Sequence, residues 1–395
     1  MKTKPLIPCI AAMLLAGCGG STSLTPTSSS IEPSSEASSS KASIEVLITD
    51  SVGRQVNVVP GSYKNAVCIG AGALRLYSYI NGAENLGGVE DIDNETLESR
   101  PKMFDGVARP YVMANSEAFS KLPSCGVGGP NAQAAEAEKI LSCNPDIIFS
   151  EYEDADKSNA LSKQTGVPVI ALASGTGGGV IASKLYQSLS NIGIAMDKAE
   201  RAKNLIDFHK AEEAAISSRT EGIKDEDKPN VYICGLGNWG TTNQFMTAQN
   251  FGPFNVAHIA NVVNDLPNNG VQKIEEEKFA ALAPKMDVMI FDAAAVKNVK
   301  GKGFDFSICK AFQTGEVYLQ MAYNAYYTNV EIALLNTWFA AKSVYPSQFQ
   351  DIDIAAKTKE ITEKFNGKDL TAAIAAKPQS FGGYQKIADP TAFFA

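Results

Sequence analysis

A tyrosine-rich stretch, VYLQMAYNAYYTNVE, is the most unusual local sequence in the chain. It brings Tyr323, Tyr326 and Tyr327 close to Asn324. Tyrosine offers a flat apolar face and a hydroxyl, and a phenolate oxygen is a hard ligand suited to ferric iron. The stretch includes the end of GEVYLQM, which has the pattern of a strand. We therefore expect these four residues to line a ligand-binding cleft, with the three tyrosines as candidate metal ligands. Packing in a core is the alternative.

Five further candidates for ligand contact lie where strand-to-helix loops are expected: Arg75, Arg109, Tyr111, Tyr152 and Trp239. An arginine can meet an anionic chelate through charge-assisted hydrogen bonds, although a solvated or structural ion pair is the alternative. Trp239 lies in GLGNWG and offers a stacking face, unless it packs in a surface turn. GLGNWG matches GxGxxG, but a polar, turn-like segment follows it instead of a helix, which disfavours dinucleotide binding.

The composition argues against several classes of function. The only histidines are His209 and His258, too few for a His-rich metal site, and neither HExxH nor GxSxG occurs. A net charge of -8 disfavours a nucleic-acid groove. We therefore expect no enzyme activity, no intrinsic cofactor and no nucleic-acid partner.

Five cysteines follow the first 43 residues, an odd number without a CxxC pair: Cys68, Cys125, Cys143, Cys234 and Cys309. Buried free thiols, which pack as small apolar groups, are the favoured interpretation. One disulfide stays possible in an exported protein.

The first 43 residues have the composition of an export signal and a tether. A short basic start precedes an apolar run, Leu6 to Gly17, that is too short to span a bilayer. The run leads into Leu-Ala-Gly-Cys, which resembles the lipobox of bacterial lipoproteins. We expect residues 1–17 to be a lipoprotein signal peptide and Cys18 to be lipidated. Residues 18–43 are then a disordered Ser-rich tether.

The rest of the chain predicts two similar α/β halves. Short apolar runs alternate with helical patterns, which favours β-α-β units and parallel sheets. The phrase AEKILSCNPDIIF, beginning at Ala137, is echoed by EEKFAALAPKMDVMIF, beginning at Glu276. We expect an N-terminal lobe over 44–177, linking helices over 178–224 and a C-terminal lobe over 225–395. Asp197 and Glu200 resemble a capping box that starts one long interlobe helix, and FNVAHIANVV around His258 looks helical.

Taken in order, these motifs resemble the ferric-siderophore and cobalamin substrate-binding proteins of ABC importers. The likeness runs through ITDSVGRQVNVV, a strand ending in Gly-x-Gly, EKILSCNPDIIFS, TGVPVIAL, one interlobe helix and a repeat of the series, and it covers 44–395. The resemblance implies two Rossmann-like α/β lobes with parallel-rich sheets, joined by one long helix that limits hinge motion. It also implies a cleft between the lobes that closes on a metal chelate.

The same resemblance implies partners and a place in the cell. One glutamate per lobe, Glu138 and Glu277, would dock against a permease, although a glutamate at a helix start also favours the helix dipole. A monomer anchored by lipid on the extracytoplasmic face, periplasmic or at the cell surface, would hand its ligand to an ABC permease and ATPase. The expected ligand is an iron(III) complex, either a ferric siderophore or ferric iron. Cobalamin, haem and molybdate or tungstate stay open, as does a metal-cluster oxidoreductase on the same plan.

Overall fold

The computed structural model describes residues 44–129, 132, 134–152, 154–174, 183–237, 242–266 and 270–395. The predicted signal peptide, Cys18 and the tether lie outside the described residues, and so does Trp239. Within the described part of the chain, no helix combines the length and apolarity needed to cross a bilayer.

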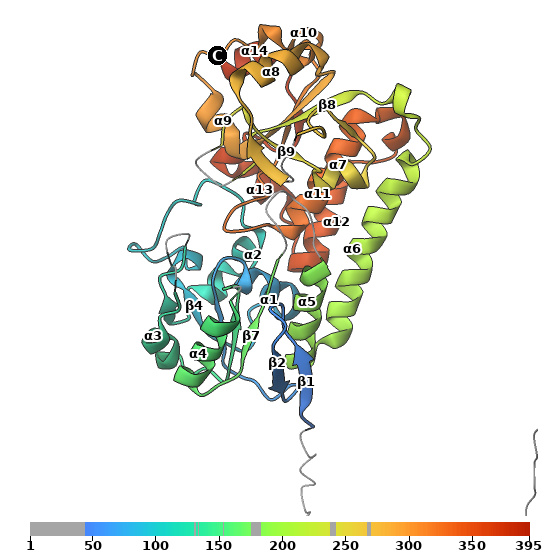
Figure 1. The fold of residues 1–395 in the computed structure, drawn as a ribbon. Helices are drawn as coiled ribbons and strands as arrows, with labels where there is room; N and C mark the ends of the chain where they lie inside the picture. The colour runs from blue at the N-terminus through green and yellow to red at the C-terminus, as the bar shows by residue number, and fades with distance from the viewer. Residues whose placement is uncertain are drawn as a thin grey trace, which may run out of the picture. The chain divides into compact units, whose positions relative to one another are not determined.

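The N-terminal lobe is built on a five-stranded parallel sheet of order β5-β4-β3-β6-β7 (Figure 1). Its strands are β3 (Ala66–Ile69), β4 (Leu86–Glu90), β5 (Ser124–Gly126), β6 (Ile147–Ser150) and β7 (Val169–Ala171). Its helices are α1 (Ala73–Asn81), α2 (Pro110–Phe119), α3 (Ala137–Ser142) and α4 (Ala155–Thr165). The strands β3, β6 and β7 are buried along their whole length, as expected for a parallel sheet that helices cover.

The C-terminal lobe repeats this plan with the strand order β10-β8-β12-β13-β14. The strands are β8 (Asn230–Cys234), β10 (Ala260–Asn261), β12 (Val288–Asp292), β13 (Val317–Gln320) and β14 (Gln385–Lys386), and only β14 is antiparallel to its neighbour. A separate antiparallel pair joins β9 (Met246–Gln249) to β11 (Gly270–Lys273). The helices are α7 (Gly252–Val256), α8 (Glu276–Leu282), α9 (Ala293–Val299), α10 (Lys310–Thr314), α11 (Val330–Val344), α12 (Ile354–Asn366), α13 (Thr371–Ala376) and α14 (Pro390–Phe394).

The repeated Glu-Lys segment of the sequence forms the same structure in both lobes. In each lobe the Glu-Lys pair lies in a short helix, α3 or α8, and a buried strand follows, β6 or β12. The aspartate before each of these strands also repeats. Asp146 accepts the backbone N–H of Asn65, and Asp287 accepts that of Asn230, at distances of 3.1 and 2.8 Å. Each carboxylate therefore holds the start of the adjacent strand, β3 or β8.

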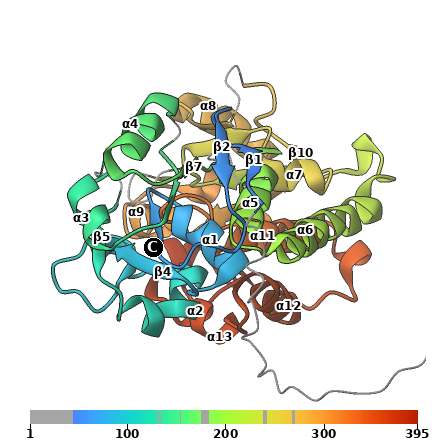
Figure 2. The same ribbon diagram turned by 90° about the horizontal axis from the view of Figure 1, so that it is seen from below.

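A hairpin of β1 (Val46–Thr49) and β2 (Gln55–Val58) lies next to β7 (Figure 2). The backbone N–H of Ser51 in its turn donates to the carbonyl of Ala171 at 3.1 Å. Arg54 also pairs with the buried Asp50 at 2.7 Å and reaches the carbonyl of Val169. The turn of this hairpin therefore covers the edge of the N-terminal sheet.

Two helices, α5 (Ser183–Ala195) and α6 (Ala199–Thr220), follow the N-terminal sheet, and α6 runs alongside both lobes (Figure 1). Helix α6 is 22 residues long and packs on α5 at one end and on α7 and α11 towards the other. The guanidinium of Arg201 donates to the carbonyls of Tyr79 and Lys364, while Glu212 accepts from the indole of Trp338 at 2.8 Å. The expected long helix between two α/β lobes is confirmed: it is α6, which is called the rod below.

Two local expectations are wrong. No capping box starts α6, because Lys198 is its N-cap and makes no side-chain cap bond, while Asp197 has φ 55 and closes α5 in a left-handed turn. His258 is not helical: α7 ends at Val256, His258 has φ 52, and β10 begins two residues later. In both places the chain turns through a left-handed residue, although the sequence there has a helical pattern.

The loop that follows β13 ties the C-terminal lobe to the N-terminal lobe. Arg75 of α1 donates to the Asn329 carboxamide at 3.0 Å and to the carbonyl of Ala325 at 2.8 Å. Asn329 in turn donates to the carbonyl of Ala108 at 3.3 Å. The Tyr79 hydroxyl donates to the buried carboxylate of Glu331. These bonds join residues about 220 to 250 positions apart, so they fix the lobes relative to each other.

A second junction centres on the carboxylate of Glu90, at the end of β4. It accepts the backbone N–H of Gly70 at 3.1 Å and the hydroxyl of Tyr326, from the other lobe, at 2.9 Å. The Tyr326 oxygen also accepts the N–H of Gly129 at 2.8 Å. Burial raises the pKa of Glu90 to about 7, and the nearby carboxylate of Asp93 adds to this increase.

The raised pKa of Glu90 predicts how stability depends on pH. Because this pKa lies above its usual 4.5, the folded chain binds more protons than the unfolded chain between about pH 4.5 and 7. The free energy of unfolding contributed by Glu90 therefore falls as pH rises through this window, by on the order of 3 kcal/mol in total. We expect Glu90→Gln, which cannot ionise, to show a smaller fall in Tm than the wild type between pH 5 and pH 8.

The control is Glu117→Gln, which removes an exposed carboxylate of α2 and should leave the slope of Tm against pH unchanged. Identical slopes for the wild type and Glu90→Gln would contradict the buried, raised-pKa carboxylate.

Candidate functional site

A cleft of about 350 Å³ lies where the strand-to-helix loops of both lobes meet. Its described lining consists of Ala71, Met103, Phe104, Gly129, Ala132, Glu151, Tyr152, Asn324, Tyr326 and Tyr327. The lining residues come from the loops after β3, β4, β5 and β6 in one lobe and after β13 in the other. Ligands of open α/β sheets bind at these carboxyl ends. The cleft is therefore the candidate ligand site.

The loop after β13 of the C-terminal lobe borders the cleft and has an uncommon backbone conformation. Tyr326 and Tyr327 are consecutive residues with φ 59 and φ 64. The left-handed region is unfavourable for bulky side chains and is enriched at functional sites. A bridge between Asn324 and Thr328 and a bond from the Ala325 N–H to the Tyr327 carbonyl hold this turn. Tyr327 is consequently 49% exposed, while Tyr326 is buried and its hydroxyl bonds to Glu90.

Tyr152 and Asn324 also line the cleft, as the sequence predicted. The Tyr152 hydroxyl donates to the carbonyl of Ala132 at 3.3 Å, and burial raises its pKa to about 12. The Asn324 side chain donates to the carbonyl of Gly237 at 3.2 Å. Both side chains are half-buried, so each presents part of its surface to the cleft.

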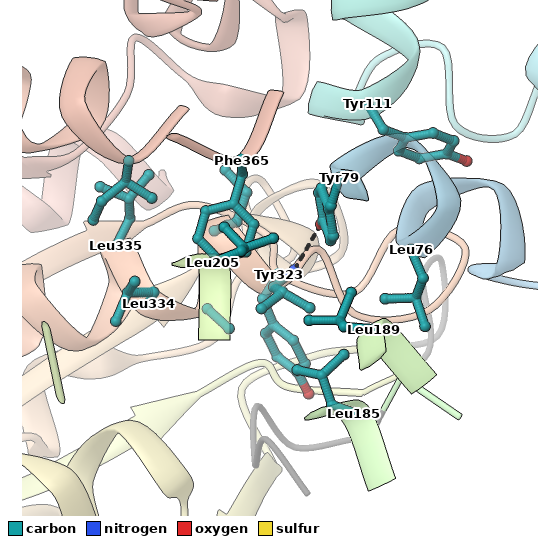
Figure 3. Packing of buried hydrophobic residues seen from close by; sticks show 14 of the residues in the cluster. Leu76, Tyr79, Tyr111, Leu185, Leu189, Leu205, Tyr323, Leu334, Leu335 and Phe365 are labelled. Carbon is teal, nitrogen blue, oxygen red and sulfur yellow. Dashed lines mark hydrogen bonds between the residues drawn. The ribbon is translucent and has the colours of Figure 1, made fainter. Parts of the chain in front are cut away.

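Tyr323 does not line the cleft, and the expectation that all three tyrosines do so is wrong for this residue. It is 1% exposed and belongs to the apolar core that both lobes share. Figure 3 shows its ring beside Leu185 and Leu189 of α5. The three tyrosines proposed as metal ligands are therefore not gathered on one surface: Tyr323 faces the core, and only Tyr326 and Tyr327 border the cleft.

Arg75, Arg109 and Tyr111 are also absent from the described lining, so the expectation that they meet a ligand is not met in this structure. The guanidinium of Arg109 pairs with Asp93 at 2.6 Å, and the Tyr111 hydroxyl donates to the same carboxylate oxygen at 2.6 Å. Arg75 lies over the Tyr111 ring, 4.7 Å from its centroid, and bonds across the lobes. The structural ion pair, the alternative for the arginines, holds for Arg109, whereas Arg75 makes hydrogen bonds to neutral groups; all three residues are buried.

Glu151 and Phe104 line the cleft without having been predicted. Glu151 directly follows β6, so its place at the carboxyl end of a strand was the signal available in the sequence. It is 4% exposed, and the Ser174 hydroxyl donates to its carboxylate at 3.2 Å. Phe104 lies in a loop between β4 and α2 that has no periodic pattern, and its ring centroid is 5.9 Å from that of Tyr326. We find no signal in the sequence that would have singled it out.

The cysteines and histidines lie away from the cleft lining. All five cysteines of the described residues are buried free thiols, which confirms the favoured interpretation over a disulfide. Cys234 and Cys309 pack in the C-terminal core, while Cys68, Cys125 and Cys143 pack in the N-terminal lobe. His209 and His258 bond separately to Tyr186 and Ser217. Among the described residues, no group of three or more His, Cys, Asp or Glu side chains is placed to hold a metal ion.

Glu138 and Glu277 occupy matching positions in the two lobes. Each lies in the first turn of its helix, α3 or α8, where a negative charge complements the helix dipole. Both side chains are exposed. Their positions are compatible with helix stabilisation and with docking.

Comparisons with known proteins agree with this geometry. The model of the periplasmic binding protein family matches residues 110–304. A search of curated proteins found no relative of the chain.

Several solved structures share the fold. A periplasmic solute-binding protein from Veillonella parvula has a TM-score of 0.65 at 17% identity, covering 85% of this chain and 96% of its own. The molybdate-binding protein MolA from Haemophilus influenzae, with molybdate bound, has a TM-score of 0.61 at 17% identity, covering 82% and 98%. The TroA-like protein FepB, also from V. parvula, has a TM-score of 0.60 at 20% identity, covering 81% and 96%.

The matched family consists of solute-binding proteins, not enzymes, that act outside the cytoplasm as components of ABC transporters. The predicted resemblance is thereby confirmed: residues 110–304 match the model of the periplasmic binding protein family, and the two-lobed fold is shared with the solute-binding proteins to which this chain is similar.

Proposed function

We propose that this protein is a lipid-anchored solute-binding protein that captures an iron(III) complex, either a ferric siderophore or ferric iron, and delivers it to the permease and ATPase of an ABC importer. The anchor would be Cys18, followed by the Ser-rich tether over 18–43. The protein would then work as a monomer on the extracytoplasmic face of the membrane, with its body reaching the permease within the span of the tether.

One observation carries the proposal: a cleft at the facing loop edges of two parallel sheets, lined by aromatic rings and hydroxyl groups. Its volume of about 350 Å³ suits a small molecule or the core of a larger chelate. Tyr327 offers a half-exposed ring and a phenol oxygen, which suit both stacking on a chelate and contact with iron. The rod α6 spans both lobes, so we expect closure on the ligand to be small.

Native mass spectrometry of the protein purified from its own host would give the mass of the bound ligand. We expect an added mass that contains iron, which metal analysis of the same sample would verify. If the captured ligand is instead cobalamin, haem, molybdate or tungstate, the proposed transport function stands and only the identity of the ligand changes. MolA, a structural neighbour, binds molybdate. A stoichiometric metal cluster would instead support the oxidoreductase alternative. A protein that never carries a metal complex, even from iron-rich cultures, would count against the proposal.

For the permease contact, we propose Glu138 and Glu277, one exposed glutamate on each lobe. The repeated Glu-Lys segment supports this proposal, because it gives both lobes a short helix with a glutamate in its first turn. Two matching charges on one body can engage a two-fold related pair of permease subunits, because each lobe then meets the same surface.

Substitution of single tyrosines should separate binding from folding. Tyr327→Ala removes a half-exposed ring, so we expect Tm to change little and the affinity for a ferric trihydroxamate to fall by about threefold to tenfold. Tyr323→Ala empties a core position and should lower the free energy of unfolding by about 3 to 5 kcal/mol. Fluorescence titration and thermal denaturation measure the two effects.

Tyr327→Phe is the matched control, because it keeps the ring and removes the hydroxyl. A loss equal to that of the alanine variant would assign the contact to the phenol oxygen. If Tyr327→Ala instead destabilises the fold as much as Tyr323→Ala does, the tyrosine belongs to the core and not to the site.

Charge reversal tests the docking residues. We expect the double variant Glu138→Lys/Glu277→Lys to bind a ferric trihydroxamate like the wild type, while uptake of the iron by cells falls by about tenfold or more. Glu200→Lys, on the exposed side of α6, is the control for a change of surface charge and should leave uptake intact. Normal uptake by the double variant would exclude these two glutamates as the permease contact.

A further inference from the structure

A second hollow, called the side hollow below, opens next to the ligand cleft. Its volume is about 340 Å³, close to the 350 Å³ of the cleft, and the two share Met103, Gly129 and Ala132 in their described lining. We infer that the side hollow is a subsite for an apolar arm of the transported complex, such as an acyl chain. The inference rests on the proposed function, because it names a feature of the ligand that the adjoining cleft would take.

The lining of the side hollow is mainly apolar. Pro101, Met103 and Val127 supply its larger side chains, and the rest of the described lining consists of two glycines, two alanines and Glu136. Met103 and Val127 are 43% and 40% exposed, and Tyr327 lines the adjoining cleft. Three of the seven large apolar side chains that the described surface exposes therefore gather at these two hollows. Single exposed apolar residues are ordinary, whereas a group of them marks a binding surface.

The charge of Glu136, the one ionisable group in this described lining, is balanced by its neighbours. Its carboxylate accepts the backbone N–H of Val127 at 2.7 Å and pairs with the ammonium of Lys139 at 2.8 Å. Positions 130, 131 and 133 of the same stretch lie outside the described residues, and they are Pro, Asn and Gln, which add no charge. An apolar arm in the side hollow would therefore not displace water from an unpaired charge.

The backbone where the two hollows join is held in place by the interlobe junction. Gly128 has φ 66, and a Cβ there would lie 2.8 Å from side-chain atoms of both Glu90 and Ile92, so glycine is needed for this close packing. The N–H of Gly129 donates to the Tyr326 hydroxyl at 2.8 Å, and that hydroxyl donates to Glu90. The connection between the hollows is thus formed without a ligand, as is usual for small-molecule sites.

This arrangement favours an amphiphilic chelate. The iron centre would lie in the cleft, whose lining includes hydroxyl and amide groups, and the arm would leave water against Pro101, Met103 and Val127. Each methylene that becomes fully buried raises affinity by about threefold to fourfold. A chelate without an arm leaves the side hollow to water and gains nothing from it.

The test compares two iron complexes that differ only in the length of an apolar arm. Desferrioxamine B is a linear trihydroxamate with a free terminal amine, and acylation of this amine with an acetyl or a hexanoyl group gives ferric complexes of the same neutral charge. We expect fluorescence titration of the purified protein to show that the hexanoyl complex binds about tenfold tighter than the acetyl complex. This comparison needs no variant, so it stands even if a substitution in the side hollow disturbs folding.

Val127→Asp then asks whether the arm lies in the side hollow. The new carboxylate must stay hydrated, so we expect the ratio of affinities between the hexanoyl and the acetyl complex to fall to about twofold or less. Ile308→Asp is the matched control, because it makes the same kind of change at a 39% exposed apolar residue of the other lobe, outside both hollows as described. We expect this control to keep the ratio of the wild type.

The possible failures are distinguishable. Equal affinities for the two complexes, or a ratio that Val127→Asp leaves intact, would overturn the subsite for an apolar arm and leave the proposed transport function standing. A ratio that falls equally in Val127→Asp and Ile308→Asp would also overturn it, because the arm would then adsorb to exposed apolar residues in general. Absence of binding for both complexes would count against the subsite and the proposed function together.

Discussion

The hydrogen bond between the Tyr326 hydroxyl and the Glu90 carboxylate is the contact on which the site depends. It joins the loop after β13 to the end of β4, and the N–H of Gly129 bonds to the same hydroxyl. A buried carboxylate is costly unless its hydrogen bonds are made. The loop is therefore held against the N-terminal lobe, which keeps Tyr326 and Tyr327 at the border of the cleft. The rod α6 and the bonds of Arg75 restrict the lobes from two further directions.

The architecture was predictable because its signals are local. Continuous apolar runs such as IIFS and VYIC become buried parallel strands, and Gly-x-Gly turns end β3 and β8 in both lobes. The repeat of the Glu-Lys phrase predicted two similar lobes, and the bonds of Asp146 and Asp287 show its physical basis. The wrong predictions, at Asp197 and His258, are places where tight left-handed turns end a helical pattern.

The site was predictable only in part, since burial there depends on partners far away in the sequence. Asn329 lies 254 positions from Arg75, and no local pattern indicates that the two meet. Tyr323 and Tyr327 belong to one stretch, yet the left-handed turn at Tyr326 and Tyr327 sends one ring to the core and the other to solvent. The sequence also predicted loops that meet where the parallel strands end, which is where ligands of open α/β sheets bind.

A crystal structure of the protein with its captured ligand, recorded at the iron absorption edge, would show whether the cleft between the lobes binds an iron complex. We expect an anomalous peak inside the cleft, between the wall formed by Glu151 and the ring of Tyr327, with the Glu90–Tyr326 bond retained. A peak elsewhere on the molecule, or a ligand bound while that bond is broken and the lobes have separated, would contradict it.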